Sequence, residues 1–118
     1  MGRVKSYQDL IVWQKSMLLV KEIYELTTSL PKSEQFGISS QAQRAAVSIP
    51  SNIAEGHERN NLKEYIQFLG VARGSAAELE TQLLIIQEVY KYKVDHHLDL
   101  LLEIRKMLLT LVKKLKEK

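Results

Sequence analysis

The sequence predicts an all-α fold, an antiparallel up-down-up-down four-helix bundle. The 118 residues include only five glycines and two prolines, so the chain has few places to turn. No alternating apolar and polar segment bounded by turn residues indicates a strand. What remains is four long segments with apolar residues at helical spacing, joined by short connections. In such a chain successive helices run in opposite directions.

The first two helices are expected over about residues 8–29 and 33–56. The first should end before Leu30-Pro31, because proline disfavours the helical conformation in the residue before it. Gly56 suits a C-terminal cap of the second. Pro50 lies inside this second helix and lacks an amide hydrogen, so we expect a kink after Ile49 or a new helix start there.

The third and fourth helices are expected over about residues 61–91 and 95–116. Asn61 and Glu64 form a capping-box pattern, in which each side chain accepts from the backbone of the other residue. Asp95 is the expected N-cap of the fourth helix. Residues 1–118 are therefore interpreted as a single four-helix domain.

The composition excludes several classes of protein. With 45% hydrophobic and 26% charged residues, the chain can bury a core of its own. The absence of cysteine excludes disulfides, thiolate catalysis and Cys-ligated zinc. Gln14, Lys15 and Ser16 interrupt the apolar N-terminal stretch, which argues against an export signal or a membrane span. We expect a cytoplasmic, bacterial protein with no membrane partner.

Nothing in the sequence supplies an active site. Glu55 with His57, or His96 and His97 with Asp99, could act as bases or metal ligands. However, the chain has no Glu-x-x-His pair, the signature of a dimetal site in a bundle. It also lacks a glycine-rich phosphate loop and a nucleophile motif. We therefore predict no catalytic, cofactor-binding or metal-binding residue, and no enzyme.

The apolar surface exceeds what one bundle needs. In the first and fourth helices apolar residues spread over about half the circumference, whereas a bundle seam needs an arc of only about 100°. On the far side of the third helix, Gly70, Gly74 and Thr81 line up where charges would be expected. Interior glycines each cost about 1 kcal/mol relative to alanine. We predict that these three residues contact another copy of the chain.

A polar stripe follows the second helix. Five residues fall within about 80° of one another at 3.6 residues per turn and border the apolar sector: Gln41, Arg44, Ser48, Asn52 and Glu55. A charge beside the core requires a partner. We expect Glu78 or Glu80 to pair with Arg44, and Arg73 with Glu55. The stripe is interpreted as a hydrogen-bonded seam that fixes register within the bundle or between protomers.

The charge is concentrated at one end. The net charge is +3, and residues 91–118 hold eight Lys or Arg against four acids. A basic end suits phosphate binding, although solvated lysines also favour a helix C-terminus. The candidate nucleic-acid-binding residues are Arg59, Lys63, Arg105, Lys106, Lys113, Lys114 and Lys116.

Several motifs resemble a known family. They are Trp13-Gln14-Lys15, Glu34-x-Phe36-Gly37, the block QAQRAAVSIPSNIAEG at 41–56, Arg59, Phe68-Leu69-x-x-Ala72-x-Gly74-Ser75 and Glu78-Leu79-Glu80-Thr81-Gln82. Together they closely resemble the four-helix-bundle proteins encoded in 23S rRNA intervening sequences, over nearly the whole chain. Ala42 departs slightly, since a larger aliphatic residue is common there. The family name records where some of its genes lie and does not establish an action on ribosomal RNA.

The resemblance implies an antiparallel four-helix bundle that assembles as a ring-like homopentamer. That family is similar to the accessory variability proteins of diversity-generating retroelements, basic pentamers that bind nucleic acid and a reverse transcriptase. No catalytic residues come with the resemblance.

Two functions from different classes remain open. The leading hypothesis is a non-enzymatic, homo-oligomeric scaffold that binds RNA or DNA through phosphate contacts. The competing hypothesis is a protein–protein adaptor for an enzyme such as a reverse transcriptase or an RNA-processing nuclease. A nuclease in its own right would need a metal-binding carboxylate cluster, which the sequence does not offer.

Overall fold

The all-α prediction is confirmed in a computed structural model, which describes residues 6–118. This part of the chain contains two short 3-10 helices and four α-helices, with no strand among them. In chain order they are η1 (Tyr7–Asp9), α1 (Ile11–Thr28), η2 (Lys32–Glu34), α2 (Ile38–His57), α3 (Leu62–Tyr90) and α4 (Asp95–Lys116).

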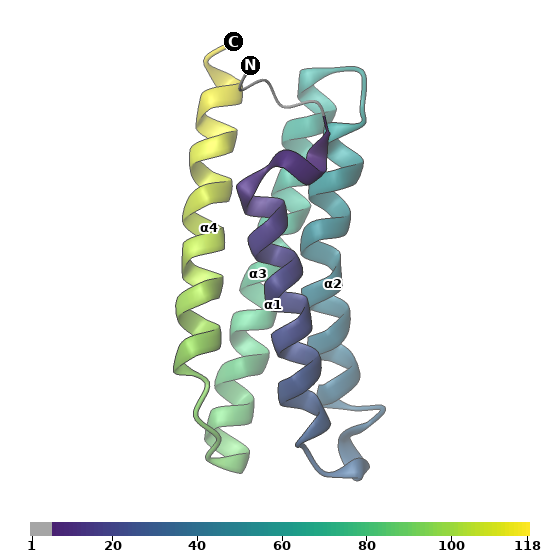
Figure 1. The fold of residues 1–118 in the computed structure, drawn as a ribbon, viewed down its shortest axis with the longest axis vertical. Helices are drawn as coiled ribbons and strands as arrows, with labels where there is room; N and C mark the ends of the chain where they lie inside the picture. Colours follow the sequence, from purple (N-terminus) through teal and green to yellow (C-terminus); the bar gives the residue numbers. More distant parts are fainter. Residues whose placement is uncertain (1–5) are drawn as a thin grey trace.

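The four α-helices lie side by side in an elongated bundle of 46 × 23 × 22 Å. Consecutive helices run in opposite directions and are joined by short connections at the two ends (Figure 1). Both α1 and α3 pack against α2 and α4. The contact of α1 with α4 and the contact of α2 with α3 therefore lie on opposite sides of the molecule.

The first predicted helix is divided near its start. Leu10 adopts an extended conformation with φ −74° and ψ 126°, which separates η1 from α1. The Ser6 hydroxyl caps η1 by accepting from the Gln8 amide at 3.1 Å. The expectation of one helix from residue 8 was wrong because this separately capped turn packs against both α1 and α2.

The second helix begins later than expected, at Ile38, because Glu34 and Gly37 build a separate turn before it. A carboxylate oxygen of Glu34 accepts from the Ile38 amide at 3.3 Å. A Cβ on Gly37 would lie 2.6 Å from that same oxygen, so the Glu34 carboxylate would have to shift to admit a side chain there.

Neither Pro50 nor Gly56 ends the second helix, so the expectations of a new helix start at Pro50 and of a cap at Gly56 were wrong, while the kink after Ile49 stays a prediction. The helix continues unbroken through the buried Pro50 to His57. Gly56 is buried within it, where an added Cβ would meet Phe68 Cβ at 2.7 Å and the Tyr65 carbonyl oxygen at 3.2 Å. This glycine allows close approach of α2 and α3 and is not a cap.

The cap predicted for α3 is partly confirmed, and the cap predicted for α4 is not. The Asn61 side chain accepts from the Glu64 amide at 2.8 Å, as expected. A Glu64 carboxylate oxygen accepts from the Asn61 side-chain amide at 3.3 Å, and not from the Asn61 backbone amide as the capping box predicts. Asp95 is the first residue of α4, and the N-cap position belongs to Val94, which offers no side-chain acceptor. The expectation of an Asp95 cap was therefore wrong.

The core runs the length of the bundle, and all four helices contribute fully buried side chains to it. Examples are Leu19 and Ile23 from α1, Ile49 from α2, Leu79 from α3 and Ile104 from α4. Each buried aliphatic side chain of this size contributes about 1.5–3 kcal/mol relative to leaving it exposed. Because this core is continuous, the positions of the surface residues discussed below are set by rigid helices.

Candidate nucleic-acid interface

The candidate cations come from two segments that are distant in the sequence. Lys113, Lys114 and Lys116 lie in the last turns of α4, and Arg59 and Lys63 flank the connection from α2 to α3. Both segments lie at the end of the bundle that carries the C-terminus (Figure 1). All five side chains are exposed, so the fold brings them to one end of the molecule.

Arginine charges in this set are already partnered. Arg59 donates to Glu55 at 2.8 Å and lies 3.9 Å from Glu64, while its guanidinium stacks 4.8 Å from the centre of the Phe68 ring. Arg105 donates to Glu80 at 2.7 Å and joins α4 to α3.

The lysines of the set are free of such pairs. Within residues 6–118, none of them has a carboxylate within 4.0 Å; they are Lys63, Lys106, Lys113, Lys114 and Lys116. Lys106 lies farther from the bundle end than the others, near the middle of α4. The lysines therefore carry the charge that an external anion could meet.

The polar stripe of α2 faces outward more than predicted. Gln41, Arg44 and Glu55 are exposed, and only Ser48 and Asn52 are half-buried. The expected pairs are wrong: Glu55 binds Arg59, Glu80 binds Arg105, and Arg44 has no ion pair within the described part of the chain. The error arose because the stripe lies on the outer side of α2, where water satisfies a charge.

A short hydrogen-bonded chain joins the stripe to α3. Ser75 donates to the Ser48 hydroxyl at 2.7 Å, and the Asn52 side-chain amide donates to the same hydroxyl at 2.9 Å. Asn52 also donates to the Ser48 carbonyl at 2.8 Å. Within one protomer the predicted seam is thus limited to Ser48 and Asn52.

Arg44 lines a shallow groove of about 500 Å³ on the outside of α2. Tyr24 from α1 and the hydroxyls of Ser40 and Ser51 share the groove with it. An unpaired guanidinium among hydroxyl groups can accept an anionic partner from outside the protomer.

The glycine row of α3 faces open space. A Cβ on Gly70 or Gly74 would meet nothing within 4 Å. Both line a groove of about 310 Å³ between α3 and α4, together with Ala77 and Leu109. The exposed Thr81 hydroxyl donates to the Ala77 carbonyl at 3.1 Å. Packing inside the protomer therefore does not explain these glycines, and the predicted contact with another copy stays a prediction.

Two polar contacts at the opposite end were not predicted. Tyr90 donates its hydroxyl to Glu34. That bond, with the one from the Ile38 amide, lowers the pKa of Glu34 below its usual value, and it raises the pKa of Tyr90. Tyr92 donates to the Ser29 carbonyl at 2.6 Å. The Glu34-x-Phe36-Gly37 motif was visible in the sequence, but its partner lies 56 residues away.

Residues 6–118 offer neither a metal-binding cluster nor a membrane-spanning helix. Residues 6–118 hold no group of three or more His, Cys, Asp or Glu side chains placed to bind a metal ion. No helix in that range is long and apolar enough to cross a membrane.

Fold and surface together define the class: a small four-helix bundle with free lysines at one end and open grooves between its helices. The chain belongs to the family of 23S rRNA-intervening sequence proteins, whose family model matches residues 8–113. The family resemblance seen in the sequence is thereby confirmed.

One solved structure shows the same fold. It is the crystal structure of a Bacteroides thetaiotaomicron protein of unknown function from the S23 ribosomal protein family, with a TM-score of 0.77 and 24% identity. The match covers 87% of this chain and 99% of that chain. No curated protein matches the chain.

Proposed function

We propose that this protein is a non-enzymatic, homo-oligomeric scaffold of the cytoplasm that binds nucleic acid through phosphate contacts. The observation that carries the proposal is the gathering of unpaired lysines at one end of the bundle. Lys63 from the start of α3 and Lys113, Lys114 and Lys116 from the end of α4 lie there, without carboxylate partners in the described chain. No cofactor or metal is required.

Self-association is supported by the outer surfaces of the helices. Large apolar side chains are exposed on all four, among them Met17, Val47, Val71 and Leu109. Exposed apolar area of this kind marks interaction surfaces when it is contiguous. The family resemblance suggests a ring of five copies. Such a ring would carry five times the net charge of +3 and strengthen attraction of a polyanion.

Binding by this surface should depend little on the base sequence of the nucleic acid. Lysines contact phosphate oxygens, which are the same in every sequence, whereas base reading needs side chains that enter a groove of the duplex. The lysines lie at a bundle end and on no protruding helix (Figure 1).

The test is fluorescence anisotropy with labelled structured RNA, duplex DNA and single strands over a salt series, with the oligomer mass fixed by light scattering. We expect log affinity to fall linearly with log salt. Replacing Lys113→Glu and Lys116→Glu together should reduce the salt slope by about two, one unit for each lost phosphate contact.

A matched control is the pair Lys21→Glu and Lys93→Glu, which changes the net charge equally. Both of these lysines are exposed, and they lie away from the basic end. An equal loss of affinity in both pairs, or no binding by the unaltered protein at low salt, would refute the proposed interface.

The second candidate function is that of a protein–protein adaptor. Phe36 favours it, because this phenylalanine is 90% exposed in the turn that Glu34 anchors. An aromatic side chain held outside the core is a common anchor of protein interfaces.

A further inference from the structure

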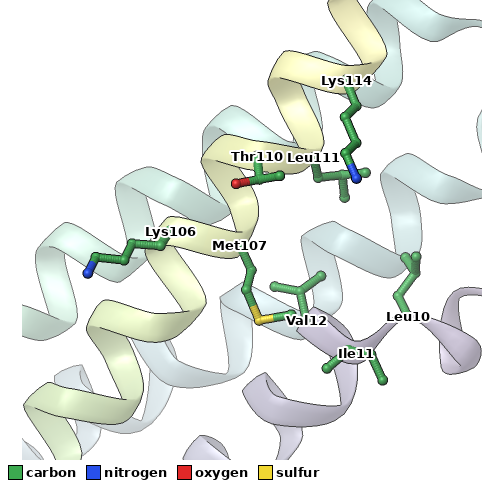
Figure 2. Close-up of a pocket in the computed structure, with 8 residues that line it drawn as sticks. All are labelled: Leu10, Ile11, Val12, Lys106, Met107, Thr110, Leu111 and Lys114. Atoms are coloured by element: carbon green, nitrogen blue, oxygen red, sulfur yellow. The ribbon is translucent and has the colours of Figure 1, made fainter.

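A groove of about 320 Å³ lies between the start of α1 and the second half of α4. Its floor is apolar: Leu10, Ile11 and Val12 face Met107 and Leu111 across it (Figure 2). Ile11 is 53% exposed, although it belongs to the first turn of a long, well-packed helix. The groove therefore presents apolar surface to water that no part of the described chain covers.

Two lysines stand at the edge of this apolar floor. Lys106 and Lys114 both come from α4 and line the groove (Figure 2). They are eight residues apart, which corresponds to about 12 Å along a helix axis. Neither has a carboxylate partner within residues 6–118, and no acidic residue lines the groove.

In the first half of α4, by contrast, polar contacts connect this helix to α1. There Glu103 pairs with Lys15 of α1 at 2.9 Å, and His96 Nε2 lies 2.8 Å from a carboxylate oxygen of Glu22. The same two helices are thus bridged by polar contacts in one half and left unbridged in the other. The missing negative charge must come from outside if these lysines are to be paired.

From this arrangement we infer that the α1–α4 groove binds an amphipathic helix of a partner protein, one whose apolar face is flanked by two carboxylates about two turns apart. Apolar side chains of the partner would fill the floor between Ile11 and Met107. Its carboxylates would pair with Lys106 and Lys114. Recognition of this kind, a helix laid in an apolar groove, needs only such anchors and charges.

The spacing of the lysines favours a helix over a smaller ligand. Because about 12 Å separates the two positions along the helix axis, each lysine can meet a carboxylate of its own. Two acidic residues seven or eight positions apart on one face of a helix match this separation. A nucleic acid would meet the lysines but leave the apolar floor unused.

This inference rests on the adaptor function and not on nucleic-acid binding. An experiment can therefore refute helix binding in the groove without refuting nucleic-acid binding, and the reverse. The probe is a labelled synthetic 18-residue peptide, helical and amphipathic, with leucines on one face and two glutamates placed two turns apart at its edge. A second peptide carries lysines in place of these glutamates. Both are titrated with the full-length protein by fluorescence anisotropy at about 0.15 M salt, where distant charges are screened.

We expect the acidic peptide to bind at least about tenfold more tightly than the basic one. The variant Lys106→Glu with Lys114→Glu should reverse that preference. Ile11→Glu should weaken the acidic peptide about tenfold, because it places a like charge in the apolar floor. Circular dichroism checks that each variant keeps its helix content.

The control is the variant Lys113→Glu with Lys116→Glu, which makes the same charge change on the same helix but outside the groove. It should leave the affinity for the acidic peptide within about twofold, while nucleic-acid affinity falls. The inference is overturned if the two double variants weaken the peptide equally, or if neither peptide binds.

A second copy of the chain is the competing occupant of the groove. Light scattering with and without the acidic peptide decides this. An unchanged oligomer mass supports a partner protein, whereas dissociation of the oligomer by the peptide would assign the groove to self-assembly and overturn the inference.

Discussion

At the scale of single residues, His97 shows how burial sets the chemistry of one side chain. It lies half-buried on α4. Burial lowers the pKa of His97 below its ordinary value of 6.5, and the neighbouring His96 acts in the same direction. Glu22 and Glu25 from α1 act against this shift and do not cancel it. The folded protein therefore favours the neutral imidazole.

This shift predicts a loss of stability in mild acid. Below pH 6.5 the unfolded chain binds a proton at His97 more readily than the folded chain, so the free energy of unfolding falls as pH drops through this range. The effect is complete once pH passes the lowered pKa. We expect the melting temperature to fall between about pH 7 and pH 5.

The variant His97→Gln isolates the effect, because glutamine remains neutral over the same range. Its melting temperature should depend less on pH than that of the unaltered protein. Glu34, whose pKa is also lowered, loses its contribution only in more acidic solution, below its ordinary value of 4.5. Identical pH profiles for the two proteins would contradict the role assigned to His97.

At the scale of the helices, glycines have opposite roles on α2 and α3. Gly56 is buried between the two helices, whereas Gly70 and Gly74 are exposed on the outer side of α3. Helix propensity treats the three alike. Their surroundings decide what a methyl group would do.

Gly56→Ala is expected to destabilise the bundle. The new Cβ would come within 2.7 Å of Phe68 Cβ, and α2 would have to move away from α3. Overpacking of this kind costs about 1–3 kcal/mol, more than the gain of about 1 kcal/mol in helix propensity. Chemical denaturation followed by circular dichroism measures the change, and a gain in stability would disprove the close approach.

Gly70→Ala and Gly74→Ala should instead stabilise each protomer, by about 1 kcal/mol each, because their Cβ atoms meet open space. If another copy packs against this row, the same substitutions weaken assembly. Light scattering over a dilution series separates the two effects. A stabilised protein with unchanged assembly would remove Gly70 and Gly74 from the proposed contact.

At the scale of the whole molecule, the bundle presents different surfaces on different sides. Free lysines gather at one end, and the stripe with Arg44 follows the outside of α2. An apolar groove lies between α1 and α4, and a groove lined by two glycines and two arginines lies between α3 and α4. Lys114 belongs both to the basic end and to the α1–α4 groove, whereas the other main residues of these surfaces are separate. That separation makes the contacts testable one at a time.

Arg44→Ala is expected to disturb assembly more than nucleic-acid affinity. The side chain is exposed and makes no ion pair within the described chain, so its removal should leave the protomer stable to within about 0.5 kcal/mol. Light scattering reports the oligomer mass and anisotropy reports binding. Loss of binding by an intact oligomer would show that Arg44 contacts nucleic acid and does not form a seam between protomers.

The sequence predicted the fold class well because the relevant signals are local. Apolar spacing within each helix, the Asn61 cap and the scarcity of glycine and proline depend on neighbouring residues only. Predictions that needed a partner elsewhere failed. The pairs proposed for Arg44 and Glu55, and the cap role of Gly56, depended on which helix lies opposite. The Asp95 cap failed by one residue, since the N-cap position belongs to Val94.

By itself the sequence determined that this protein is all-helical, that its charge is concentrated near the C-terminus and that it belongs with the 23S rRNA-intervening sequence proteins. Tertiary structure decided which cations are free, since packing brings Glu80 of α3 to Arg105 of α4 but brings no carboxylate to the lysines of the basic end within the described chain. It also decided where the grooves lie. Periodicity gives the face of each helix, but only the packing of α1 against α4 leaves Ile11 and Met107 facing a shared opening.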